Sequence, residues 1–119
     1  TLRYYYTSEA APCSEWSCLS DERDAVVSCD DVSVGFASYS SPSGLANAYF
    51  EVTFSTDSAE VLGANGGSSG RLKLSVQKPK FAVQDVTNDY SYDGRMLSLS
   101  DWPKVTLQRD GQLLYGTPP

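Results

Sequence analysis

The sequence predicts an all-β domain, a β-sandwich with jelly-roll topology. Hydrophobic residues alternate with a period of two along several short segments, and turn-forming clusters of Gly, Ser, Asn and Pro separate them. No segment of ten residues has a convincing helical period. Many short strands joined by such turns are typical of sandwiches and jelly rolls. The 119 residues are expected to form one domain, residues 1–119, that buries roughly 65% of its unfolded surface.

Each expected strand is supported by its own pattern. The segments are LRYYYT at 2–7, VSVGFASY at 32–39, AYFEVTF at 48–54, RLKLSV at 71–76, KVTLQR at 104–109 and QLLYG at 112–116. In the fourth segment, Leu72, Leu74 and Val76 are expected to face the core. The last two segments flank Asp110-Gly111, a strong hairpin signal because a type I′ turn needs positive φ at both central residues.

The connections are expected to be turns and loops. SSPSG at 40–44 and GANGGSSG at 63–70 are rich in turn residues and too short for interdomain linkers. SDERDAVVS at 20–28 is expected to form one or two helical turns at most. The cysteine-containing stretch 13–29 is expected to be a loop.

The composition limits the possible functions. The chain has 9 Lys and Arg against 15 Asp and Glu, a net charge of −6, which disfavours nucleic acid and an anionic membrane surface as partners. A neutral ligand or a cation suits this charge better. Histidine is absent, which removes the commonest general base and zinc ligand. The sequence has neither an apolar run long enough to span a membrane nor a signal-peptide pattern.

Three cysteines, Cys13, Cys18 and Cys29, lie close together in the sequence. One disulfide with one odd thiol is the simplest arrangement, and three pairings are possible. Three reduced, buried thiols are the alternative, whereas a zinc site is disfavoured because a fourth ligand is missing. The clustering favours an oxidising, extracellular setting, so we expect a secreted protein.

The beginning and the end of the chain carry a resemblance to a known family. The matching segments are LRYYYT at 2–7, NDYSY at 88–92, DWPKVT at 101–106 and DGQLLYGTPP at 110–119. Together they resemble the family 3 carbohydrate-binding modules, cellulose-binding jelly rolls attached to cellulases and cellulosomal scaffolds. Residues 13–47 and 75–84 match poorly, and the family's first strands have no counterpart. If the sequence begins at the native boundary, open sheet edges are expected, and these invite pairing with another chain or segment. If the sequence is an excised piece, part of the domain is missing from it.

The resemblance implies a structural calcium ion between two segments. Its ligands would come from Thr7 and Glu9 in the first segment and from Asp85, Asn88 and Asp89 in the second. Calcium prefers six to eight oxygen ligands, which carboxylates, amides, hydroxyls and carbonyls supply. The alternative interpretation is that Asn88 and Asp89 only cap a turn, as these residue types commonly do.

The resemblance also implies a linear ligand-binding strip on a flat sheet face. Arg71 matches the strip arginine, Gln77 lies near the place of the strip tryptophan, and Tyr39 is a loose counterpart of the strip tyrosine. The expected Asp-His pair is absent, so most of the strip is missing. Trp16 and Phe81 are the candidate replacement rings, because an apolar sugar face packs on an aromatic ring.

The predicted function is a non-catalytic module that binds cellulose or a related β-glucan and targets an attached cell wall-degrading enzyme, such as a glycoside hydrolase. No catalytic motif is present, so an enzyme is not expected. The alternative is a helper or interaction domain of the same fold that packs on a catalytic domain or on a second copy through open sheet edges. A third hypothesis is a structural domain that binds another protein through an edge strand.

Overall fold

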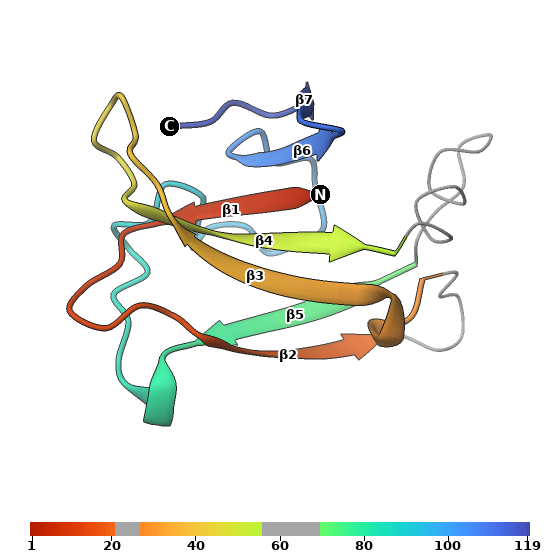
Figure 1. The fold of residues 1–119 in the computed structure, drawn as a ribbon, viewed down its shortest axis with the longest axis horizontal. Helices are drawn as coiled ribbons and strands as arrows, with labels where there is room; N and C mark the ends of the chain where they lie inside the picture. Colours follow the sequence, from red (N-terminus) through yellow and green to blue (C-terminus); the bar gives the residue numbers. More distant parts are fainter. Residues whose placement is uncertain (21–26, 56–69) are drawn as a thin grey trace.

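The computed structural model describes residues 1–20, 27–55 and 70–119, which form two antiparallel sheets (Figure 1). Five strands lie in the order β3-β4-β1-β6-β7, and β2 pairs with β5 in a second sheet. The all-β sandwich prediction is confirmed. The strands are β1 (Leu2–Tyr6), β2 (Glu15–Ser20), β3 (Val32–Ser38), β4 (Ala48–Phe54), β5 (Leu72–Gln77), β6 (Val105–Arg109) and β7 (Gln112–Tyr115); the short 3₁₀ helices are η1 (Cys29–Asp31) and η2 (Pro79–Phe81).

The core lies between the two sheets and follows the predicted alternation. In the larger sheet Tyr4 pairs with Phe50, and their rings stack with centroids 4.9 Å apart. Leu72 and Leu74 of the smaller sheet pack against a cluster that contains the fully buried Val52. The period of two therefore determines which side chains the sandwich buries.

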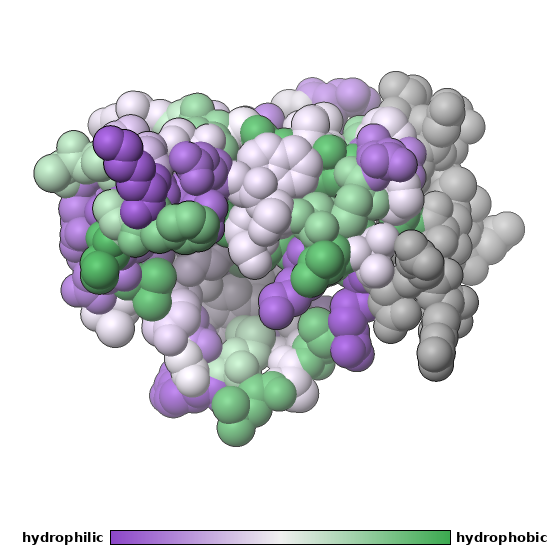
Figure 2. Space-filling view, turned by 90° about the horizontal axis from the view of Figure 1, so that it is seen from below, coloured by the Kyte–Doolittle hydropathy of each residue, from purple (hydrophilic) through white to green (hydrophobic). Residues whose placement is uncertain are grey.

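The outer surface on the β2 side mixes hydrophilic and hydrophobic residues (Figure 2).

The Asp110-Gly111 hairpin is confirmed. The two residues have φ values of 50° and 78° and connect β6 to β7, as a type I′ turn requires. Gly111 accepts this backbone without strain because it has no Cβ.

The loop expected at 13–29 is partly wrong, because Glu15–Ser20 forms strand β2. The segment EWSCLS alternates only from Glu15 to Cys18, and Leu19 breaks the pattern. It becomes a strand by pairing with β5, where Trp16 is opposite Val76 and Cys18 is opposite Leu74. Tertiary pairing thus overrides a weak local preference.

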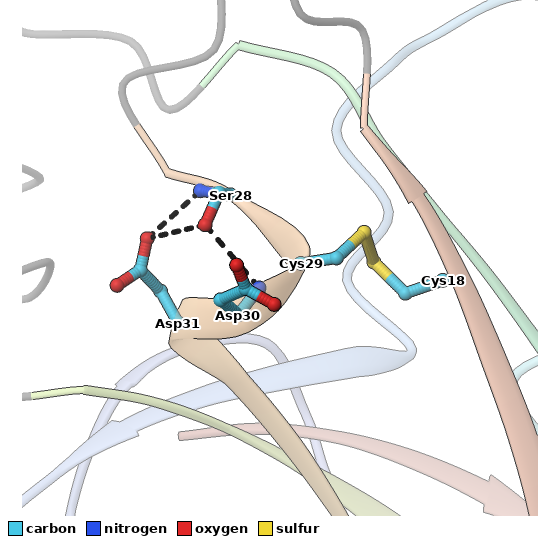
Figure 3. Close-up of a disulfide and its surroundings, with 5 residues drawn as sticks. All are labelled: Cys18, Ser28, Cys29, Asp30 and Asp31. Carbon is cyan, nitrogen blue, oxygen red and sulfur yellow. Dashed lines mark hydrogen bonds between the residues drawn. A yellow bond between two sulfur atoms is a disulfide. The ribbon is translucent and has the colours of Figure 1, made fainter.

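One disulfide and one free thiol are present, as the simplest arrangement predicts. Cys18 in β2 is bonded to Cys29 in η1, and Cys13 is free and buried (Figure 3). Ser28 caps η1, and the carboxylate of Asp31 accepts from its backbone N–H at 2.9 Å. The disulfide joins the smaller sheet to the turn that leads into β3.

Two expectations concern residues largely outside the described part. The helical turns expected at 20–28 fall mainly on 21–26, and the glycine-rich loop at 63–70 falls almost wholly on 56–69. None of the helices in the described ranges has the length and hydropathy needed to cross a membrane.

Candidate functional site

The end of β1 meets the segment that contains the acidic cluster, as the calcium hypothesis requires. Ser91 Oγ accepts from the Tyr5 N–H at 2.9 Å, and the Ser91 N–H donates to Tyr5 O. Just beyond the end of β1, the Thr7 N–H donates to Asp89 Oδ1 at 3.0 Å, and Thr7 Oγ1 donates to Asn88 O at 3.3 Å. These hydrogen bonds join segments that are more than eighty residues apart in the sequence. They bring backbone and side-chain oxygen atoms of both segments close together.

Gln84 joins the same group, although the sequence pattern did not single it out. Its Nε2 donates to Thr7 O at 2.9 Å and lies 3.4 Å from Asp85 O. The Asp85 carboxylate accepts from the Thr87 N–H and hydroxyl, and these hydrogen bonds hold the pKa of Asp85 below its usual value. Asp85 therefore offers its backbone carbonyl to the group, while its side chain caps a turn.

Glu9 has a different partner from the other predicted metal ligands. Its Oε2 lies 3.2 Å from Nζ of Lys78, a lysine that is only 4% exposed. The same ammonium donates to Val83 O at 3.2 Å. Glu9 thus compensates a buried charge, and Lys78 is a second residue that sequence reasoning did not place at this site.

Asp89 is the buried acid of the group, with 8% of its surface exposed. Burial raises its pKa to about 6, and the charges of Asp85 and Glu9 act in the same direction. Hydrogen bonds from the Thr7 backbone and the Gln84 side chain oppose the shift. Ionised Asp89 would therefore gain from a nearby cation.

The donor set fits a hard cation better than a soft one. Within the described ranges, no three Asp, Glu, Cys or His side chains are arranged to hold a metal. The gathered donors are backbone carbonyls, one hydroxyl and one carboxylate, which suit calcium. Gln84 Oε1 is also buried there without a hydrogen-bond partner. By these observations the residues present fit a calcium ion, with Glu9 as the exception.

The predicted glycan-binding residues divide between two faces of the sandwich. Arg71 lies just before β5, and the alternation along β5 places Lys73, Ser75 and Gln77 on the outward face of the smaller sheet. Gln77 Nε2 donates to Glu15 Oε2 on the neighbouring strand at 3.1 Å. From 71 to 77 this polar row extends about 20 Å, at the usual rise of a strand.

The two candidate stacking rings differ in position. Phe81 in η2, beyond the end of β5, is 77% exposed. Trp16 is 36% exposed, and its register opposite Val76 places it on the inward side of β2. Phe81 is thus free to contact a ligand at the end of the polar row, whereas Trp16 lies on the other side of the strand.

Tyr39 lies apart from the other four candidates, on the outward face of the larger sheet. Its ring is 5.1 Å from Tyr5 and 6.0 Å from Tyr49, and its hydroxyl donates to Pro119 O at 3.4 Å. Tyr90 also belongs to this tyrosine face and donates to a backbone carbonyl near the C-terminus. Tyr5 and Tyr49 are cross-strand partners, so the alternation along β1 and β4 places both on this face. Tyr90 is the member of the group that the sequence did not single out.

Comparison with known proteins agrees with this fold. Endoglucanase A of Paenibacillus lautus is 30% identical over 123 residues, which cover 100% of this chain and 16% of the relative. A solved structure described as the unique CBM of Ruminiclostridium thermocellum has a TM-score of 0.74 and 27% identity, over 99% of this chain and 74% of that chain. The family 3b module of a Bacteroides cellulosolvens scaffoldin has a TM-score of 0.69 and 28% identity, over 99% and 72%.

Two packed antiparallel sheets make this chain a β-sandwich domain. The chain belongs to the CBM_3 family, described as a cellulose binding domain, whose model matches residues 1–116. This is a family of non-catalytic binding domains, so the chain is a carbohydrate-binding module and not an enzyme. The resemblance inferred from the sequence is confirmed.

Proposed function

We propose that the module binds cellulose or a related β-glucan through the outward face of β2 and β5, and that it targets an attached cell wall-degrading enzyme to this substrate. The observation that carries the proposal is the row of hydrogen-bonding side chains from Arg71 to Gln77, with the exposed ring of Phe81 beyond its end. Endoglucanase A of Paenibacillus lautus, which contains a similar segment, supports the link to a glucan-degrading enzyme.

The chemistry of this face suits an extended polar chain. Arg71 and Gln77 can donate to sugar hydroxyls, and Phe81 can pack on the apolar face of a ring. Because the outward residues of the described strands β2 and β5 include no aromatic ring, hydrogen bonding contributes more than stacking. Attachment to a tethered enzyme would raise its local concentration on an insoluble substrate.

The separation of the candidate rings supports a second function. Trp16 lies on the inward side of β2 and Tyr39 on the opposite face of the sandwich, so neither extends the row at Arg71. A module without a continuous aromatic strip could serve instead as a helper domain that packs on a catalytic domain or on a second copy of itself.

Depletion binding to microcrystalline cellulose, with chitin, xylan and soluble xyloglucan alongside, tests the proposal. We expect binding to at least one β-glucan, and about tenfold weaker binding for Arg71→Ala and for Phe81→Ala, because each removes a charged donor or an apolar contact. Arg109→Ala, an exposed arginine on β6, is the matched control and should bind normally. Binding to none of the four polysaccharides would favour the helper function.

The proposal includes a structural calcium ion held by oxygen atoms of Thr7, Asp85, Asn88 and Asp89. At one hundred times its dissociation constant, a ligand of the native state stabilises it by about 2.7 kcal/mol. We therefore expect calcium to raise the melting midpoint above that in chelator by about 10 °C for a domain of this size. Equal midpoints, together with no calcium by elemental analysis, would contradict the ion.

An extracellular location is the remaining part of the proposal. The Cys18–Cys29 disulfide supports it, because such bonds persist mainly in oxidising compartments.

A further inference from the structure

Gln84 lies between the two segments that bring the oxygen atoms together. Its Nε2 is 2.9 Å from Thr7 O and 3.4 Å from Asp85 O. Its side chain also hydrogen bonds to Asp89, which lowers the pKa of that carboxyl. One amide NH₂ group thus donates to backbone oxygen atoms of two residues of the proposed calcium site. The partial positive charge of this NH₂ group reduces the repulsion between the oxygen atoms around it. A bound cation would have the same effect, but more strongly.

The other end of the same amide has no partner. Gln84 Oε1 is buried, and no hydrogen bond reaches it within the described structure. A half-turn about the terminal torsion exchanges Oε1 and Nε2, and this torsion is broad and nearly two-fold. After the turn, Oε1 would face Thr7 O and Asp85 O. Three oxygen atoms in that arrangement are stable only with a positive charge among them.

We propose that Gln84 is a further ligand residue of the calcium site. Its side-chain oxygen joins the Thr7, Asp85 and Asp89 oxygens when the ion is bound, and its amide nitrogen holds them together when the ion is absent. The inference rests on the calcium ion of the proposed function. Gln84 and Asp89 also line a cavity of about 220 Å³ between the two sheets, which gives the amide space to turn.

Calcium titration of the metal-free protein by calorimetry, with melting curves in chelator, tests the assignment. Gln84→Met, which keeps the length but removes both polar atoms, should weaken calcium binding about tenfold and lower the metal-free midpoint. Gln84→Glu should strengthen binding about tenfold but also lower the metal-free midpoint, because an anion replaces the donor among oxygens. Ala82→Glu adds the same charge at an exposed position of the same segment and controls for long-range attraction.

The proposal predicts opposite effects of Gln84→Glu on the two forms of the protein: stronger calcium binding, but a lower melting midpoint of the metal-free form. Unchanged calcium affinity in Gln84→Met with a lowered metal-free midpoint would overturn it, since Gln84 would then be only a hydrogen-bond donor. An equal gain in Ala82→Glu and Gln84→Glu would overturn it as well. If the unaltered protein binds no calcium, the ion and this inference both fail, whereas glucan binding is decided separately by depletion.

An NMR measurement gives an independent readout. Calcium should shift the side-chain amide signals of Gln84, while those of Gln112, in β7 at the edge of the larger sheet, stay in place. Equal or absent shifts at the two residues would contradict direct ligation by Gln84.

Discussion

Replacing Ser91 with alanine is expected to destabilise the domain by about 1–3 kcal/mol, because it leaves the buried Tyr5 N–H and the partly buried Lys104 carbonyl without this partner. Ser91 is 3% exposed, and its hydroxyl accepts from the Tyr5 N–H and donates to Lys104 O at 2.6 Å. The same residue's carbonyl accepts from Trp102 Nε1 at 2.8 Å. One small side chain therefore connects β1 to the segment that leads into β6.

Urea denaturation of Ser91→Ala against Ser33→Ala measures this effect. Ser33 is an exposed serine of β3, so its replacement should change the free energy of unfolding by no more than about 0.5 kcal/mol. A similarly small change for Ser91→Ala would show that the backbone groups of Tyr5 and Lys104 find other partners.

Replacing Glu9 with alanine is expected to lower the free energy of unfolding, measured in chelator, by about 1–3 kcal/mol. The buried Lys78 ammonium would then keep only the Val83 carbonyl as a partner. The value lies between those for exposed and fully buried ion pairs, since the Glu9 side chain is 41% exposed and that of Lys78 is 5% exposed. Lys78→Met removes the charge itself and should cost less. The double variant should therefore be more stable than Glu9→Ala alone.

A double-mutant cycle in chelator and in calcium distinguishes the two roles of Glu9. If Glu9→Ala has no effect in chelator but abolishes stabilisation by calcium, Glu9 is a calcium ligand, as the family resemblance implies. A coupling energy with Lys78 that is the same in both buffers supports the ion pair as its function.

The strands that follow their own alternation were predictable from the sequence. Leu72, Leu74 and Val76 face the core as expected, because neighbouring side chains of a strand point to opposite faces. The turn at Asp110-Gly111 was predictable for a similar reason, since its φ values depend on two adjacent residues. These are local properties, and a single segment contains all of the information they need.

Strand β2 and the ligand face depended on pairing between distant segments. Trp16 was a plausible sugar-stacking ring by composition, but its register opposite Val76 places it on the inward side. Tyr39 was grouped with Arg71 by family resemblance, although it belongs to the tyrosine face of the larger sheet. Which face a side chain occupies depends on the register, and the alternation in EWSCLS, from Glu15 to Cys18, is too short to identify a strand or its inward face.

The sequence by itself determined the fold class, the family and the meeting of Thr7 with the acidic segment, because alternation, turn chemistry and family motifs are readable along the chain. Only the tertiary structure decided that Glu9 pairs with Lys78 and that Gln84 lies among the gathered oxygen atoms. The physical reason is that burial and hydrogen-bond distance join groups from segments about seventy or more residues apart. The partner of a buried charge depends on that packing and not on local sequence.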